Sequence, residues 1–386
     1  MTAFSNSDAA QLKLHILSEG ISFDAAFLKQ FEYDHSSMEK RRAYDDSDDR
    51  HLDRKSRIPQ EVYLKDVVVA VNYKPRSPWR LIYRDKVYRL VGNNGIDVEA
   101  TFPHRPRFFE RITPGGVRCD RVANLYGGSS LAFFTPANCY YFNDGHECKF
   151  CSLKPNRSSQ QLFLNTISPT LAASVLEIAL QTDAHLLKQI MLVGGNLSNY
   201  DQGFQRHLKI AQALDEQQSS LPIERRLQTH IATMPPRDFG LFASLEDLNA
   251  RISMNLEVFD EHLFEVICPG KASLYGRQRL LDALEHAASM VSGKRVHSIL
   301  IAGLEPVRST IAGIRYLASI GVTPIVNVFH NDHGSHYEEH SRPPYEDLLE
   351  IAFALQEVYR EYDLTPYWKG CGRNALDFEA QQGWFV

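Results

Sequence analysis

Residues 136–155 read Pro-Ala-Asn-Cys-Tyr-Tyr-Phe-Asn-Asp-Gly-His-Glu-Cys-Lys-Phe-Cys-Ser-Leu-Lys-Pro and place three thiols, Cys139, Cys148 and Cys151, in one short segment. Soft thiolate ligands suit iron–sulfur clusters and zinc. Three thiolates can hold one face of an iron–sulfur cluster, and the missing fourth thiolate leaves one metal site open to a ligand. We therefore expect the rest of the chain to surround this segment, which is called the cysteine loop below.

Length and composition predict a large, mostly ordered protein. The 386 residues suffice for one α/β domain of roughly 200–250 residues with an appendage. Hydrophobic residues make up 44% of the chain, so a sizeable core is available. The net charge of −5 gives no footprint for nucleic acid or an anionic membrane, and no apolar run approaches the length of about 18 residues that spans a bilayer. Three of the six cysteines are bunched, which favours metal over disulfides, and the absence of a signal-peptide pattern predicts a cytoplasmic protein.

From about Ser129 onward, strand-like and helix-like segments alternate. Strands are predicted at 131–135, 188–193, 225–233, 250–256, 296–303 and 323–329. Helices are predicted at 169–182, 201–216, 236–245, 274–291, 309–320 and 345–362. Six β–α repeats predict a parallel sheet covered by helices, with ligands at the carboxyl ends of its strands. One active site is predicted there by the groups that follow strand ends: the cysteine loop, Gly194-Gly195, Glu257, Glu305 and His330.

The first 125 residues lack the alternating strand and helix pattern of the rest of the chain. Residues 1–60 are predicted to form a helical adaptor, with a helix over 21–33 capped by Ser22 and a charged, solvated linker over 39–57. Residues 61–125 are predicted to form a small β-rich appendage with a hairpin at 83–88. We expect it to pack on the main domain, and one option is that it covers an open end of that domain.

The cysteine loop, Gly194-Gly195 after the second strand and the six repeats together resemble the radical S-adenosylmethionine superfamily. Its fold is a partial (β/α)6 TIM-type barrel, which the resemblance places at residues 126–340, with 341–386 as a C-terminal helix and tail. The family's usual loop is C-x3-C-x2-C with an aromatic residue before the last cysteine. Here Phe150 keeps that place, whereas the first spacing is eight residues. The barrel sequence resembles biotin synthase-like members more than the peptide-modifying ones.

The resemblance implies a role for individual residues. Cys139, Cys148 and Cys151 would ligate three irons of a 4Fe-4S cluster, and S-adenosyl-L-methionine would bind the fourth iron. The implied cofactor-binding residues are Phe150, Gly194, Gly195, Ser253, Asn255, Glu257, Gly303 and Val326. An electron from the cluster, supplied by a partner such as flavodoxin or ferredoxin, would cleave S-adenosylmethionine to a 5′-deoxyadenosyl radical. That radical would abstract a hydrogen atom from a small-molecule substrate.

The reaction itself stays open. One option is a single-cluster rearrangement, dehydrogenation, epimerisation or C–C bond step. An alternative is a two-cluster, sulfur-inserting enzyme whose auxiliary cluster uses Cys119, Cys268 and Cys371. A remote alternative is a non-enzymatic binding protein with a zinc held by the cysteine loop and His146. Candidates for substrate chemistry are Cys371, as a hydrogen-atom donor, and the histidines His330 and His333.

Overall fold

A seven-stranded sheet forms the centre of the fold in the computed structural model, which describes residues 4–41, 57–155, 163–368, 370 and 372–386. Six strands are parallel and lie in chain order: β8 (Ser130–Phe134), β9 (Gln189–Val193), β10 (Gln228–Ala232), β11 (Ala250–Ser253), β12 (Val296–Ala302) and β13 (Thr323–Val328). β7 (Ala123–Tyr126) pairs antiparallel with β8 at one edge. Every predicted strand is present, and the predicted α/β class is confirmed. Among the described strands, β7 and β13 do not pair with each other, so the sheet is open.

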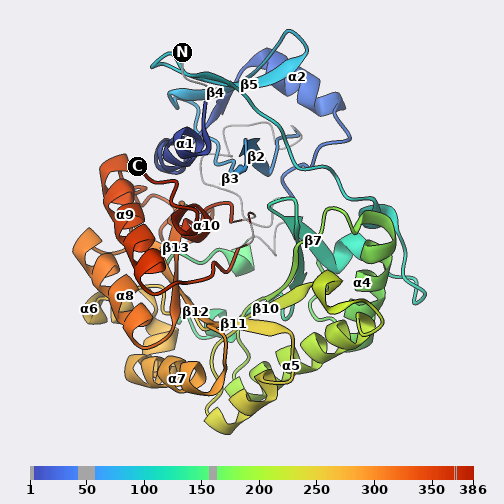
Figure 1. Ribbon diagram of the computed structural model, residues 1–386, viewed down its shortest axis with the longest axis vertical. Coiled ribbons are helices and arrows are strands. Elements are labelled where there is room, and N and C mark those ends of the chain that lie inside the picture. The colour runs from blue at the N-terminus through green and yellow to red at the C-terminus, as the bar shows by residue number, and fades with distance from the viewer. Residues whose placement is uncertain (1–3, 42–56, 156–162, 369, 371) are drawn as a thin grey trace.

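Helices cover the outer face of this curved sheet (Figure 1). They are α4 (Pro169–Asp183), α5 (Tyr200–Gln217), α7 (Arg277–Met290), α8 (Val307–Ser319) and α9 (Tyr345–Glu361). Because helices cover one face and side chains fill the other, the strands are almost wholly buried, as the seven buried residues of β12 show. The helix predicted at 236–245 is instead a 3₁₀ segment, η6 (Phe239–Leu245). Shorter elements are η2 (Arg107–Glu110), η3 (Cys119–Arg121), η4 (Tyr140–Phe142), η5 (Ile223–Arg225), α6 (Glu261–Ile267), η7 (Lys271–Tyr275) and α10 (Asp377–Gln381).

The N-terminal residues build helices and two small sheets. The helices are α1 (Asn6–Glu19) and α2 (Ala25–Tyr33), and the strands are β1 (Ser22–Phe23), β2 (Glu61–Leu64), β3 (Val67–Ala70), β4 (Trp79–Arg84), β5 (Val87–Gly92) and β6 (Asp97–Glu99). The predicted hairpin is present as β4–β5. Ser22 does not cap a helix as predicted, because it pairs with β4, and Asp24 caps α2 by accepting a 2.6 Å hydrogen bond from the amide of Phe27. Helix α1 was not predicted.

The β2–β3 hairpin lies beside the open edge of the large sheet at β7. Gln60 donates to the carbonyl of Leu125 at 3.2 Å, and the Tyr63 hydroxyl donates to the carbonyl of Gly127 at 3.0 Å. Figure 1 shows β2 and β3 between the N-terminal helices and the edge strand β7. The hairpin therefore covers one side of the gap between β7 and β13. This agrees with the option that the β-rich segment covers an open end of the main domain.

The C-terminal residues 374–376 cover the other side of the gap. The amide of Val328, at the end of β13, donates to the carbonyl of Asn374 at 2.8 Å. Ala70, at the end of β3, donates to the carbonyl of Arg373 at 3.1 Å. One segment from each end of the chain thus spans the opening between β13 and β7. Buried residues from Ala9 to Phe385 form one apolar cluster, and the predicted division into domains stays a prediction.

A buried lysine on α1 holds this C-terminal segment in place. Lys13 is 0% exposed, and its ammonium group donates to the carbonyls of Gly372 and Ala375 at 2.6 and 2.7 Å and to the carboxylate of Glu379 at 2.7 Å. These three acceptors match the three donors of an ammonium group, so the buried charge is fully paired.

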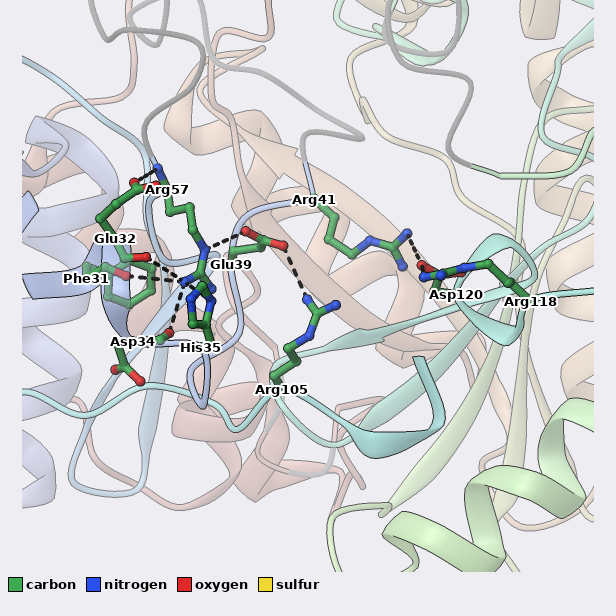
Figure 2. A network of polar contacts seen from close by, with 10 residues as sticks. All are labelled: Phe31, Glu32, Asp34, His35, Glu39, Arg41, Arg57, Arg105, Arg118 and Asp120. Atoms are coloured by element: carbon green, nitrogen blue, oxygen red, sulfur yellow. Dashed lines mark hydrogen bonds and ion pairs between the residues drawn. The ribbon is translucent and has the colours of Figure 1, made fainter. Parts of the chain in front are cut away.

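Most of the charged linker predicted at 39–57 lies outside the described residues, but its two ends are held by ion pairs (Figure 2). Arg57 contacts Glu39 at 2.8 Å, and Glu39 also accepts from Arg105 at 3.2 Å. Arg41 lies 3.9 Å from Asp120, and its side chain is only 8% exposed. The prediction of a solvated linker is therefore wrong for Arg41. Its guanidinium group lies over the rings of Phe109 and Phe163.

The carboxyl group of Asp377, which begins α10, predicts a pH dependence of stability. Burial raises the pKa of Asp377 to about 7, despite a hydrogen bond from the amide of Trp368. The unfolded chain releases this proton near pH 4, so between about pH 4 and 7 the folded state binds more protons, and stability falls as the pH rises. Between pH 4 and 8 this group should lower the free energy of unfolding by up to about 4 kcal/mol, and we expect Asp377→Asn to remove that decrease.

The measurement is the free energy of urea unfolding at pH 5, 6, 7 and 8. Asp363→Asn, at a fully exposed side chain, is the matched control and should keep the wild-type profile. Parallel profiles for Asp377→Asn and the wild type would show that Asp377 does not carry this pH dependence.

Candidate active site

The cysteine loop lies across the carboxyl ends of several strands. It follows β8, and backbone hydrogen bonds tie it to segments that follow other strands. The amide of Tyr140 donates to the carbonyl of Asn196 after β9 at 2.8 Å, and that of Lys149 donates to Ile267 at 2.8 Å. In turn, the amide of Tyr337, beyond β13, donates to the carbonyl of Lys149 at 3.1 Å. The loop is therefore fixed from three sides.

The glycine pair after β9 is required for the loop to lie where it does. A Cβ at Gly194 would stand 2.2 Å from the carbonyl oxygen of Pro136, and one at Gly195 would stand 2.1 Å from that of Asn138. Only glycine allows this approach of two backbones. The pair thus has a packing role, and the predicted contact to the methionyl ammonium group stays a prediction.

The three thiols form an electrostatically connected group. Burial raises the pKa of Cys139 and Cys151, and the neighbouring Cys148 sulfur contributes to both shifts. Cys148 is 9% exposed. Each thiolate of a 4Fe-4S cluster binds a different iron, so three sulfurs spread along one loop fit the donor set of such a cluster. In the described part of the chain, no three His, Cys, Asp or Glu side chains converge to hold a single metal ion.

Cys268 lies next to Cys148 and was predicted only as a ligand of an auxiliary cluster. A hydrogen bond from Cys268 lowers the pKa of the Cys148 thiol, and burial raises the pKa of Cys268 itself. Cys119 has other surroundings, since it is buried on η3 and its electrostatic neighbour is Asp120. Cys371 lies outside the described residues. The auxiliary cluster therefore stays a prediction.

A cavity of about 300 Å³ opens inside the sheet, next to the cysteine loop. Five residues predicted for the site line it: Phe150, Cys151, Asn255, Glu257 and His330. Further polar or aromatic residues of its wall are Tyr126, Phe134, Ser152, Asn327, Phe329, Asp332, Tyr367, Trp368, Arg373 and Asn374. The wall thus combines the loop, the strand ends and the C-terminal residues Tyr367, Trp368, Arg373 and Asn374, none of which was predicted for the site.

Glu257 has the most unusual backbone in this wall. Its φ of +70° lies in the left-handed region, which a non-glycine residue rarely adopts and which often marks a functional site. Its carboxylate accepts from the ammonium group of Lys271 at 2.9 Å, and Lys271 also donates to the carbonyl of Asn255 at 2.6 Å. Lys271 is 6% exposed and was not predicted as a site residue. The only signal for it in the sequence is its place soon after the fourth strand, in Cys-Pro-Gly-Lys.

His330 and Asp332 form a second polar pair in the wall. His330 Nδ1 lies 2.9 Å from Asp332 Oδ1, and the Ser152 hydroxyl donates to Asp332 Oδ2 at 2.5 Å. Asp332 is buried and therefore orients both neighbours. His333 instead pairs with Glu338 at 2.8 Å, and its side chain is 48% exposed, away from the cavity wall.

Three predicted cofactor residues lie behind the wall rather than in it. Ser253 is buried and donates to Asn255 Oδ1 at 2.5 Å, which orients that amide. Val326 is 0% exposed within β13. Gly303 has a φ of +99°, and a Cβ there would stand 2.7 Å from the ring of Pro343. Glu305, another residue after a strand end, accepts hydrogen bonds from the amides ahead of α6.

Comparisons with known proteins add a sequence relative and two solved structures. No family model matches the sequence. Bacteriochlorophyllide c C-7(1)-hydroxylase from Chlorobaculum limnaeum is 23% identical over 240 residues, which are 58% of this chain and 58% of the relative. The match thus spans less than two thirds of the relative's own length.

The structure of a radical SAM methyltransferase from Sphaerobacter thermophilus is 12% identical, with a TM-score of 0.45 over 78% of this chain and 82% of that one. Methylornithine synthase is 16% identical, with a TM-score of 0.44 over 66% of this chain and 71% of that one. The first of these structures is named as that of a radical SAM enzyme, the superfamily that the cysteine loop resembles. Each of the three proteins is named as an enzyme. The TM-scores, both below 0.5, add nothing on the site. No helix in the described part of the chain is long and apolar enough to cross a membrane.

Replacing Gly195 tests whether the glycine pair positions the thiols. We expect Gly195→Ala to displace the loop at Asn138 and Cys139, because the new methyl group would overlap backbone that cannot move as a flexible side chain does. The variant should lose most of its iron after anaerobic reconstitution. Gly203→Ala is the matched control, since its nearest neighbour would stand 3.7 Å away. Equal iron content in the two variants would contradict this role.

Proposed function

We propose that this protein reductively cleaves S-adenosyl-L-methionine at a 4Fe-4S cluster held by Cys139, Cys148 and Cys151, and acts on a small molecule in the central cavity. The observation that carries the proposal is that three thiols lie on one loop, and that Cys151 and Phe150 of this loop line a cavity at the carboxyl ends of parallel strands. When bound, the cluster and S-adenosylmethionine together supply a carbon-centred radical that removes a hydrogen atom from the substrate.

In this proposal, residues of the chain bind and orient S-adenosylmethionine. Asn255 and Glu257 present an amide and a carboxylate to the cavity, where they would bind the ribose and amino groups of S-adenosylmethionine. Lys271 fixes the Glu257 carboxylate and balances its charge at 2.9 Å. Phe150 supplies an apolar face beside the cysteines. Aromatic and aliphatic wall residues exclude water, which protects a reactive intermediate.

His330 is the proposed group for moving a proton at the substrate. It lines the cavity, and its Nδ1 lies 2.9 Å from Asp332 Oδ1, so that a buried carboxylate orients an imidazole that can carry a proton near neutral pH. His333 is paired with Glu338 and is the weaker candidate. A reducing protein such as flavodoxin or ferredoxin would supply the electron, and a cytoplasmic location is part of the proposal.

The experiment is anaerobic reconstitution, followed by metal analysis and by assay of 5′-deoxyadenosine formation with dithionite and S-adenosylmethionine. We expect about four irons per chain and a broad absorbance band near roughly 400 nm. Replacing Cys139, Cys148 and Cys151 together with alanine should remove the iron and the product. Cys119→Ala, away from the loop, is the control and should keep both.

Other outcomes separate the alternatives. About seven or eight irons per chain, reduced by half when Cys119, Cys268 and Cys371 are replaced, would favour the two-cluster, sulfur-inserting enzyme. One zinc and no iron would contradict the proposal and favour the zinc-stabilised binding protein.

A further inference from the structure

We propose that Arg373 binds a carboxylate of the substrate, so that the substrate is an organic acid whose apolar part packs against the aromatic side chains around Arg373. The inference rests on the proposed function, since it names the substrate class of that same cavity.

Arg373 reaches the cavity from the C-terminal segment that spans the gap in the sheet. Its side chain is 20% exposed, and Arg373 and Asn374 both line the cavity. The guanidinium carbon lies 5.0 Å from the centre of the Tyr126 ring, on β7 at the opposite side of the gap. The segment and the edge strand thus hold the cation between them.

One side of the guanidinium group is occupied and the other is available. Arg373 Nε lies 3.2 Å from Glu61 Oε1, which is 0% exposed and also accepts from Gln60 and from the amide of Gly127. Within the described residues, the two terminal nitrogens of Arg373 have no acceptor. Arg373 Nε is ion-paired with Glu61 without a hydrogen bond between them. The terminal N–H groups of a guanidinium form a fork that matches a carboxylate.

The charges around the cavity favour an anion at this place. Glu61 faces Arg373 at Nε, 3.2 Å away, and burial raises the pKa of Glu61 while the charge of Arg373 lowers it. The other charged wall residues have their own partners, because Glu257 pairs with Lys271 and Asp332 pairs with His330. A substrate carboxylate would complete the charge balance at Arg373.

The side chains around Arg373 define the rest of the ligand. Tyr126, Phe134 and Met191 belong to a small apolar cluster, against which Trp368 packs. Phe150 packs against the large cluster, and Trp368 packs against both clusters. The cavity therefore has an aromatic compartment with a cation at its edge, which suits a flat or hydrocarbon group that carries an acid.

The competing explanation is a purely structural role for Arg373, as the ion-pair partner of Glu61 at the gap in the sheet. It predicts that replacement lowers stability but does not change which ligands bind. Discrimination between a carboxylate and an uncharged analogue of the same shape separates the two explanations.

The test uses phenylacetate and phenylacetamide as probes of the full-length protein, reconstituted anaerobically and saturated with S-adenosylmethionine. Isothermal titration calorimetry gives the dissociation constants. We expect the wild type to bind phenylacetate about tenfold or more tighter than phenylacetamide, the size of effect that one charge-assisted contact gives. Arg373→Gln should reduce the preference to within about twofold, and Arg373→Lys should keep part of it. Arg84→Gln, at an exposed ion pair with Asp97, is the matched control and should keep the full preference.

Glu61→Gln keeps the test decisive if Arg373→Gln does not fold. It removes the internal carboxylate that competes for Arg373, so phenylacetate should bind more tightly, whereas a structural role predicts no such gain. The proposal is overturned by equal affinities for the two probes in the wild type, by an undiminished preference in Arg373→Gln, or by an unchanged or weaker affinity for phenylacetate in Glu61→Gln. S-adenosylmethionine cleavage is measured on the same samples. Absent cleavage with an intact, Arg373-dependent preference would reject the proposed reaction but not the carboxylate site.

Discussion

The close approach of Gly194-Gly195 to the backbone at Pro136 and Asn138 is the contact on which the candidate site depends. It brings the end of β9 against the beginning of the cysteine loop, and the loop can then extend over neighbouring strand ends. Because parallel strands present all their carboxyl ends at one edge, residues from β11 to β13 reach the same cavity as the loop. A methyl group at either glycine would separate these parts.

The open sheet creates a second requirement, which both ends of the chain meet. Six parallel strands do not close into a barrel, so the polar edges at β7 and β13 need partners. The β2–β3 hairpin covers one edge and residues 374–376 cover the other, with Lys13 and Glu61 as the buried charges that fix their positions. The same closure places Arg373 and Trp368 in the cavity wall. The segment that closes the gap in the sheet therefore also forms part of the cavity wall.

The sequence predicts the sheet well because its signal is local. Most residues of each parallel strand are buried, and helices separate the strands along the chain; α4 and α5 carry their own side-chain caps. The cysteine loop, Phe150, Asn255, Glu257 and His330 follow strand ends, so topology alone brings them together. The elements that were missed depend on distant partners. Lys13 is a charged residue among the buried residues of α1, and its partner Glu379 lies 366 residues away. Arg373 resembles any surface arginine until Glu61 and Tyr126 are placed beside it.

The central claim is that the cysteine loop holds a cluster with one iron open to S-adenosylmethionine. Electron paramagnetic resonance of the dithionite-reduced protein, before and after addition of S-adenosylmethionine, tests it most directly. The account predicts the signal of a reduced 4Fe-4S cluster whose g-values change when S-adenosylmethionine binds the open iron. A cluster signal that S-adenosylmethionine leaves unchanged, or the absence of any cluster signal in protein that contains zinc, would contradict it.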